Sequence, residues 1–477
     1  MSDTMRRAVL LILVLVTVTG GSAADRLVAR GSPATLLSVP ASALVAGPAA
    51  STSAWYCAGS AAAPAGTSAS VVVTNPFPRP LSGAVEAYGV GPGAGTAAVS
   101  IAFEAPAGGQ VSVPLTAAAA ARVVLDGGGA GVFEVLSGAI GWTTAPCDST
   151  TAVNWLFAHG STAPGRAMYV SLFNPSATES VVDLSFVSAT AGLVVPPAYQ
   201  GIPVPAGSVV VEDVSDHVQN DASLATSVVA LSGTVVASEV LEAGTAGNGG
   251  VSILAGDSAP RPQWAFPQND DVTGGGTVFT VFNPSSRPAP VTVTITLAEG
   301  QAAPLHLELP SMSTATVAAQ DQTRIPSNAP FAVRFDAPAP GIVVGREAFS
   351  PPGPTTPTDG ETSASPGAER RWLLPAVPPP GHGTWALGIL NMAGRAVHVS
   401  VGIFDGTGRF VALAGERAVT LRRAGFLELG PAPPAPIGQV PLSVVADGPV
   451  AVELDPEPIG APGTVVLGPW ALLSPEG

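Results

Sequence analysis

The sequence predicts an all-β protein, a tandem array of about four immunoglobulin-like β-sandwich repeats of roughly 100 residues each. Three landmarks recur in a fixed order: an opening tryptophan, an asparagine at a strand end, and a glycine before a closing apolar strand. They are Trp55, Trp155, Trp264 and Trp372; Asn75, Asn174, Asn283 and Asn391; and Gly138, Gly233, Gly341 and Gly448. The tryptophan-to-asparagine offsets are 20, 19, 19 and 19 residues, which favours a true internal repeat.

The strands inside a unit are predicted from a two-residue alternation of apolar and polar side chains. Residues 291–297 alternate Val or Ile with Thr, and residues 182–186 and 397–401 follow the same rule. No window of similar length has a helical period with caps. The 55 Gly and 49 Pro residues are numerous enough to end a strand about every ten residues, as β-sandwiches require.

The landmarks also set the expected domain boundaries. We expect a signal peptide at 1–24, a leader at 25–53, sandwich repeats at 54–150, 151–243, 263–350 and 370–458, a connector at 244–262, a Pro/Ser/Thr-rich linker at 351–369, and a C-terminal strand or tail at 459–477. The first two repeats are separated by only a few residues. A closing strand that continues into the next opening strand, so that neighbouring repeats share strands, therefore stays an alternative.

Charge and composition argue against nucleic acid as a partner. The formal net charge is −15, only 11% of residues are charged, and every basic residue is Arg. A net negative surface repels the phosphate backbone.

The amino terminus predicts export. Arg6 and Arg7 precede an apolar run at 8–18, and small residues at 21–24 follow. The run is shorter than the roughly 20 residues that span a bilayer, and no second run of that length follows. We expect a protein that is secreted or lies on the outer face of the cell envelope, without a membrane span in its mature chain. A retained signal anchor is the alternative.

Cys57 and Cys147, the two cysteines of the chain, are expected to form a disulfide that ties the ends of the first repeat together. Half of a metal site is the alternative, but no His or carboxylate stands at ligand spacing.

The chain resembles a family of exported actinobacterial proteins of unknown function, DUF5719. The resemblance rests on the signal followed by Trp55, Tyr56 and Cys57, on the matching Cys147, and on the Phe-Asn-Pro-Ser strand ends at 173–176 and 282–285. It implies a location in the cell envelope and no established activity, and it brings no catalytic or binding residues.

No catalytic, cofactor-binding or metal-binding residues are expected. The five histidines do not stand at metal-ligand spacing, and no nucleophile elbow or phosphate-binding glycine loop occurs. His159, next to a loop serine, is the most suggestive, but catalytic triads assemble from distant segments. Residues 269–271 and 405–406 offer oxygen ligands for Ca²⁺, although a loop and a hairpin turn are the simpler interpretations.

Aromatic side chains suggest a second hypothesis for function, carbohydrate binding. The four repeat tryptophans are expected to fill sandwich cores, although an exposed tryptophan would suit a sugar face. Tyr88, Tyr199 and Trp385 are candidate ligand-facing aromatics.

The sequence therefore favours a non-catalytic structural or interaction protein of the cell envelope. A cell-wall carbohydrate-binding protein is the first alternative, and an envelope enzyme with a site assembled between repeats is the second. The expected partner is an envelope protein or a cell-wall glycan.

Overall fold

The computed structural model describes residues 51–90, 99–115, 119–138, 141–245, 248–270, 276–298, 300–327, 329–349, 359–363, 368–376, 384–413, 419–429 and 440–457. All of them belong to one compact unit, Pro40–Gly477. The predicted signal peptide, nearly all of the leader and the C-terminal tail lie outside the described residues.

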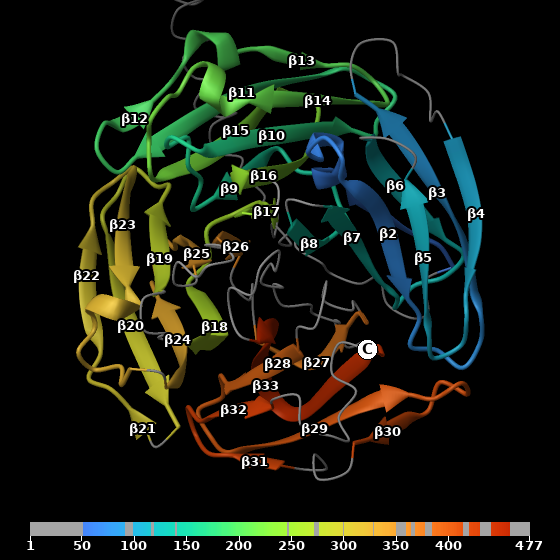
Figure 1. Cartoon of the computed structure of the whole chain (residues 1–477), viewed down its shortest axis with the longest axis vertical. Coiled ribbons are helices and arrows are strands. Elements are labelled where there is room, and N and C mark those ends of the chain that lie inside the picture. The colour runs from blue at the N-terminus through green and yellow to red at the C-terminus, as the bar shows by residue number, and fades with distance from the viewer. Residues whose placement is uncertain are drawn as a thin grey trace, which may run out of the picture. The chain divides into compact units, whose positions relative to one another are not determined.

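The described part of the chain is all-β, as the sequence predicts. It contains no α-helix, and its only helical turns are four short 3-10 segments: η1 (Gly59–Ala62), η2 (Pro197–Tyr199), η3 (Val214–Asp216) and η4 (Ala319–Asp321). The strands pair antiparallel in seven sheets (Figure 1). No helix in these residues is long and apolar enough to cross a membrane.

Residues 53–146 form the first pair of sheets. The sheet that contains Trp55 has the order β1-β6-β3-β4, formed by β1 (Ser53–Cys57), β6 (Ala119–Leu125), β3 (Leu81–Gly89) and β4 (Val99–Ala105). The sheet whose β2 leads into Asn75 has the order β5-β2-β7-β8, formed by β5 (Gln110–Leu115), β2 (Ser68–Thr74), β7 (Gly131–Gly138) and β8 (Gly141–Pro146). We call these the first Trp sheet and the first Asn sheet, and name the later pairs likewise.

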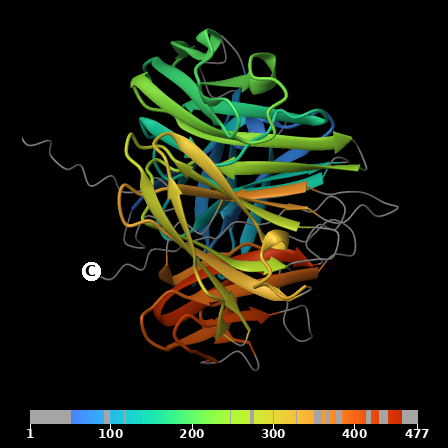
Figure 2. The ribbon, with the colours of Figure 1, turned by 90° about the vertical axis from the view of Figure 1, so that its left-hand side faces the viewer.

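The second pair has the same arrangement. The second Trp sheet contains β9 (Asn154–Phe157), β15 (Leu224–Ser232), β11 (Ser180–Ser188), β12 (Gly192–Val194) and β13 (Ile202–Val204). The second Asn sheet contains β14 (Ser208–Asp213), β10 (Arg166–Asn174), β16 (Val236–Thr245) and β17 (Asn248–Ala255). The two sheets lie as superposed layers, green in Figure 2.

The third pair follows the same order. Its Trp sheet contains β18 (Gln263–Asp270), β24 (Pro330–Asp336), β20 (Ala289–Leu297), β21 (Gly300–Gln301) and β22 (Leu305–Leu309). Its Asn sheet contains β23 (Ser313–Ala318), β19 (Gly276–Asn283), β25 (Val343–Phe349) and β26 (Asp359–Ser363).

The last seven strands form one continuous sheet. They are β27 (Glu369–Leu374), β28 (Thr384–Asn391), β29 (Val397–Phe404), β30 (Phe410–Ala412), β31 (Val419–Leu421), β32 (Phe426–Leu429) and β33 (Leu442–Glu457). The 16-residue β33 pairs with β27 and β29 through its first half and with β28 through its second half. It therefore joins what are two separate sheets in each earlier pair.

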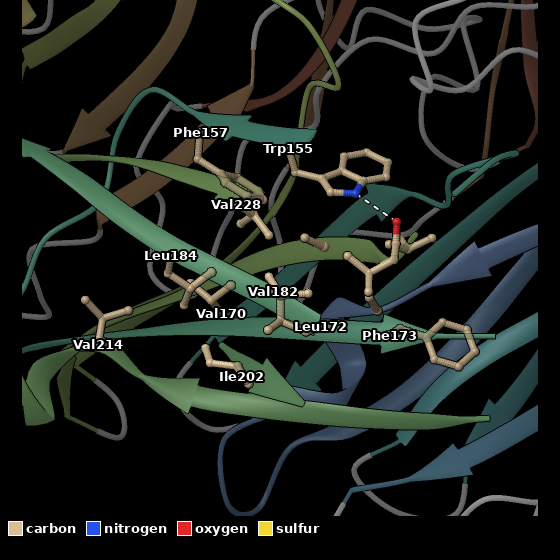
Figure 3. Close-up of a cluster of buried hydrophobic side chains, with 14 of the residues drawn as sticks. Trp155, Phe157, Val170, Leu172, Phe173, Val182, Leu184, Ile202, Val214 and Val228 are labelled. Atoms are coloured by element: carbon tan, nitrogen blue, oxygen red, sulfur yellow. Dashed lines mark hydrogen bonds between the residues drawn. The ribbon is translucent and has the colours of Figure 1, made fainter. Parts of the chain in front are cut away.

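Side-chain alternation places the cores as the sequence predicts. On β20, Val291, Val293 and Ile295 are at most 2% exposed, whereas Thr292 and Thr294 on the other face are only partly buried. In the second pair, Trp155, Leu184 and Val228 of the Trp sheet belong to one cluster with Val170 and Leu172 of the Asn sheet (Figure 3). Burial of these apolar side chains is the main favourable term in the stability of each pair.

The cores continue from one pair of sheets into the next. The ring of Phe173 on β10 lies 5.1 Å from that of Tyr88 on β3, centroid to centroid. Ala265 of the third pair clusters with Leu390 of the seven-stranded sheet. That sheet also meets the first pair, because Phe133 shares a cluster with Trp372.

Three expectations need correction. Gly138 does not precede the closing strand of the first unit, because it is the last residue of that strand, β7. The register shows this: the residue before the landmark asparagine pairs with Gly131 in the first unit, as it pairs with Val236 in the second and with Val343 in the third. The connector 244–262 and the linker 351–369 each contain a strand, β17 and β26, that pairs with the preceding closing strand. The strand β26, Asp-Gly-Glu-Thr-Ser, has no apolar residue to mark it, since backbone pairing needs none. The strand β17 has only a short apolar run, which lies in a Gly-rich stretch, although Val251, Ile253 and Leu254 are buried.

The alternative of a strand shared between the first two units is not seen. The strand β8 pairs with β7 in the first Asn sheet, whereas β9 pairs with β15 in the second Trp sheet. The chain between them makes an isolated bridge, Ala152 to Val235.

Candidate functional site

A buried polar cluster lies where the second and third pairs of sheets meet. His159, in the loop after β9, is 4% exposed. Its Nδ1 is 2.9 Å from Oγ1 of Thr280 on β19, and its Nε2 is 3.5 Å from Oε2 of Glu347 on β25. The other oxygen of Glu347 accepts a 2.5 Å hydrogen bond from Nη2 of Arg166 on β10. The cluster therefore joins segments more than 100 residues apart in the chain.

A shallow pocket lies beside this cluster, around Arg166. It is lined by Ser161, Arg166, Ala167, Leu241, Glu242, Ala243, Gly250 and Ser252. Burial raises the pKa of Glu242, and the nearby Asp213 carboxylate raises it further. The pocket thus offers one guanidinium, one carboxyl and hydroxyl groups, which suit hydrogen bonding to a small polar group.

A hydroxyl, an imidazole and a carboxylate in contact have the composition of a catalytic triad, so their accessibility decides their role. Thr280 is completely buried, and its hydroxyl faces His159. A substrate carbonyl cannot reach that hydroxyl in this structure. The acid next to His159 is Glu347. The side chain of Asp270 is outside the described residues.

A second polar cluster joins the third pair to the seven-stranded sheet. Arg346 on β25, 1% exposed, donates to Oε1 of Glu453 on β33 at 2.6 Å. It also donates to the backbone oxygen of Gln268 and, at 2.9 Å, to Oδ1 of Asn269. Glu453 accepts from the amide of Gln268 at 3.0 Å. Burial raises the pKa of Glu453, and the Arg346 guanidinium opposes this rise.

Buried carboxyl groups also lie near the junction of the first and second pairs. Burial raises the pKa of Glu134 to about 7, against the lowering effect of hydrogen bonds from the amides of Ser60 and Gly59. Burial likewise raises the pKa of Asp148, and the charges of Glu134 and Asp257 raise it further.

Asp257 belongs to the same group. Burial raises its pKa to about 6, partly offset by Arg261, whose Nε lies 3.2 Å from Oδ1. Across the described residues, no three His, Cys, Asp or Glu side chains are placed to hold a metal ion. These acids therefore lie close enough to influence one another without forming a chelating set.

The landmark asparagines all make the same contacts. Each Nδ2 donates to the backbone oxygen four residues later, and each Oδ1 accepts from the amide two residues later; the side chains are Asn75, Asn174, Asn283 and Asn391. Each is at most 1% exposed. They are the turn residues that the sequence predicts.

The four opening tryptophans are core residues, between 0 and 2% exposed. Three of them donate from Nε1 to a backbone oxygen at the start of the closing strand or beside it: Trp155 to Val235, Trp264 to Ile342 and Trp372 to Val450. Figure 3 shows the first of these bonds. Their faces are covered, so they do not offer sugar-stacking platforms.

The predicted cysteine pair is present, with Cys57 and Cys147 joined in a disulfide. The tyrosines, however, are not ligand-facing. Tyr88 is 6% exposed and packs on Phe173, and Tyr199 is 1% exposed with its hydroxyl donating to the backbone oxygen of Asp213. Both rings pack between elements that only the tertiary fold brings together. The side chain of Trp385 is outside the described residues.

The loop expected at 269–271 is wrong for Asn269 and Asp270, which end the strand β18, because the chain pairs there with β24. The hairpin turn expected at 405–406 is present. Asp405 accepts from the Thr407 hydroxyl at 2.6 Å and closes the hairpin between β29 and β30, which also lowers its pKa. His398 is exposed and bonds Asp447 at 2.9 Å.

The sequence reasoning missed Glu134, Arg346 and Glu453. Their signal is a charged residue within a largely apolar closing strand. Such a charge can be buried only if another part of the fold supplies a partner, and the sequence alone does not locate that partner.

The matched family is described as a family of unknown function, DUF5719, and its model covers residues 134–432. Cys147 and the Phe-Asn-Pro-Ser strand ends lie within this range, whereas Trp55 and Cys57 precede it. No curated protein matches the chain.

Solved structures offer only weak likenesses. A crystal structure of Thermotoga maritima 1070 is 15% identical, over 22% of this chain and 92% of its own, with a TM-score of 0.20. The Anabaena sensory rhodopsin transducer is 22% identical, over 18% and 87%, with a TM-score of 0.17. A tetra-tandem repeat from the extending region of a large adhesion protein is 13% identical, over 83% and 93%, with a TM-score of 0.11.

Because the family model spans more than half of the sequence, this chain belongs to the DUF5719 family.

Proposed function

We propose that this protein is a non-catalytic structural or interaction protein of the cell envelope, exported and built of four tandem immunoglobulin-like β-sandwich repeats. The observation that carries the proposal is that the described landmark and charged residues make structural contacts, within a unit or between neighbouring units. The asparagines and tryptophans hold the strand ends and cores of their own units. His159, Arg346, Glu347 and Glu453 connect one unit to the next.

Recurrent strand pairing supports four repeats. In the first three units, the strand that contains the landmark tryptophan pairs with the strand just before the closing strand. In the fourth unit, the strand that contains Trp372 pairs with the first half of β33. Each strand that leads to a landmark asparagine pairs with the closing strand itself. The fourth unit obeys this scheme within one sheet, because β33 supplies both partners.

Contacts between units favour a spacer or scaffold over an enzyme. Buried charged and aromatic contacts at the junctions resist bending between neighbouring units, since separating them would expose apolar surface to water and break buried polar contacts. A linked array of this kind presents sheet edges and loops at fixed positions for an envelope partner.

A binding experiment tests the proposal. The exported chain would be incubated with purified cell-wall glycan and, separately, with solubilised envelope proteins, while tryptophan fluorescence is followed. We expect retention by an envelope protein with unchanged emission, because the four repeat tryptophans are buried. Retention on glycan with quenching, abolished by Trp385→Ala, would replace our proposal with the carbohydrate-binding alternative.

Export is tested independently. Amino-terminal sequencing of the protein recovered from the envelope and culture medium should give a chain that starts near Ala24 or Asp25. A cytoplasmic protein that keeps Met1 and reduced cysteines would contradict the proposed location.

A further inference from the structure

In each Trp sheet, the edge opposite the Trp-containing strand is called here the outer edge. These outer edges differ in whether the edge strand is continuous. In the second and third Trp sheets and the seven-stranded sheet, the edge is divided between two short strands: β12 and β13 have three residues each, β21 and β22 have two and five, and β30 and β31 have three each. In the first Trp sheet the same edge is a single seven-residue strand, β4. It is the last strand of its sheet (Figure 1).

Edge strands in natural proteins are usually short or interrupted, because a continuous edge pairs with other chains. Pro196 and the 3-10 turn η2 interrupt the second edge, and Pro304 precedes β22. The sequence of β4, Val-Ser-Ile-Ala-Phe-Glu-Ala, contains neither proline nor a positive charge. No described strand pairs with its outer side.

The side chains of β4 are suited to a partner strand. Ile101 and Phe103 point to the core side of the sheet but are only partly buried, and Val99 is 41% exposed. Ser100, Ala102 and Glu104 are exposed on the opposite face. A further strand beside β4 would cover Ile101 and Phe103 and satisfy the outward backbone groups.

The sequence of β4 is complementary to itself. In an antiparallel pair centred on Ala102, Phe103 lies opposite Ile101 of the other copy, an aromatic and β-branched pair that stabilises sheets. Glu104, its one charged residue, lies opposite Ser100 of the other copy rather than opposite itself. Antiparallel pairing of identical strands is also compatible with a two-fold axis, the commonest symmetry of oligomers.

We propose that β4 is the docking edge for a second copy of this chain, whose own β4 pairs with it antiparallel about a two-fold axis at Ala102. The first Trp sheet then continues across the axis into the same sheet of the partner. Because each chain carries a net charge of −15, repulsion opposes the pair and salt favours it.

Light scattering and sedimentation of the full chain over a concentration series test the proposal. We expect the mass to rise from that of one chain towards twice that value. The rise should begin at lower protein concentration in about 0.5 M than in about 0.05 M salt, because the Debye length is then roughly 4 Å instead of roughly 14 Å. Ala102→Glu places like charges face to face and should abolish the rise. Ala191→Glu adds the same charge at an exposed position in the turn between β11 and β12 and should leave the rise unchanged.

Cysteine cross-linking tests the register. Ala102→Cys should form a disulfide-linked dimer, because its two copies face each other at a distance that a disulfide spans. Ser100→Cys and Glu104→Cys should cross-link only when the two variants are mixed. Native Cys57 and Cys147 are buried and bonded to each other, so they do not interfere. A protein that keeps the mass of one chain throughout would overturn the proposal. Equal effects of Ala102→Glu and Ala191→Glu, or self-linking by Ser100→Cys, would also overturn it.

Discussion

Buried polar side chains in this protein act mainly on the backbone. Asn174 donates to the oxygens of Thr178 and Val204 at 2.7 and 2.9 Å, so one amide group fixes a turn and the strand that returns beside it. Its Oδ1 accepts from the amide of Ser176 at 3.0 Å, which completes the turn. Both ends of the side chain are therefore used, as expected for a buried polar group.

We predict that Asn174→Ala lowers the free energy of unfolding by about 1–3 kcal/mol, because buried backbone groups lose their hydrogen-bond partner. Urea denaturation monitored by circular dichroism measures the change. Asn154→Ala, an exposed asparagine on β9, is the matched control and should have almost no effect. Equal losses in the two variants would show that the Asn174 contacts are unimportant.

The buried ion pair predicts a larger effect. Glu453→Ala removes the carboxylate that neutralises Arg346 inside the protein, and should cost about 3–5 kcal/mol. The same truncation in the exposed pair Arg395–Asp447, Asp447→Ala, should have little effect on stability, because water screens exposed charges. Thermal unfolding of both variants gives the comparison; similar melting temperatures would contradict a structural role for Arg346 and Glu453.

At the scale of elements, close backbone approach joins β28 to the end of β18. A Cβ on Gly388 would lie 2.8 Å from Cβ of Gln268 and 2.9 Å from the carbonyl carbon of Pro267. Neither atom is the flexible end of a side chain, so the strands would have to move apart.

Gly388→Ala should therefore destabilise the protein by about 1–3 kcal/mol, as overpacking commonly does. Gly394→Ala is the control, because no heavy atom lies within 4 Å of the position that its methyl group would take. Limited proteolysis would locate the effect: new cleavage near β28 is expected in the first variant alone. Unchanged cleavage and stability in Gly388→Ala would disprove the close contact.

For the whole molecule, the disulfide is the covalent constraint on the first unit. It joins residues 90 positions apart, and the loop-entropy relation gives about 4–5 kcal/mol as an upper expectation. Comparing urea denaturation of the oxidised and reduced chain tests this value. A loss confined to probes in the first unit would show that the units unfold separately, whereas a single shifted transition would show that they unfold together.

The buried carboxyl groups make stability depend on pH. Glu134 and Asp257 have pKa values raised to about 7 and about 6 in the folded protein, above their ordinary values of 4.5 and 3.8. The folded state thus holds more protons than the unfolded state between about pH 4 and pH 7, so stability falls as pH rises through this range.

We expect the free energy of unfolding to be lower at pH 8 than at pH 5, by about 2–3 kcal/mol from Glu134 alone, an order-of-magnitude value. Denaturation at both pH values measures the difference. Glu134→Gln keeps an acceptor for only one of the two amides, that of Gly59 or that of Ser60, and it cannot titrate, so it should remove much of the pH dependence. An undiminished difference in that variant would assign the effect to other groups.

The sequence by itself determined the strands and the units' landmarks. Alternation at 182–186 and 291–297 identifies β11 and β20. The Trp-to-Asn spacing identifies the four asparagines that make the same turn contacts. Both features depend on residues near one another in the chain. Composition failed at β26, which has no apolar residue and pairs through its backbone, and at β17, whose short apolar run lies in a Gly-rich stretch.

Only the tertiary structure decided which residues meet across units. Tyr88 and Tyr199 look like surface aromatics in the sequence, yet the fold covers both rings. Arg346 meets Glu453 across 107 residues, and His159 meets Thr280 across 121. No local pattern encodes such contacts, because they depend on how sheets stack. Stacking is decided by the complementary shapes of two faces that the chain brings together only after each sheet has formed.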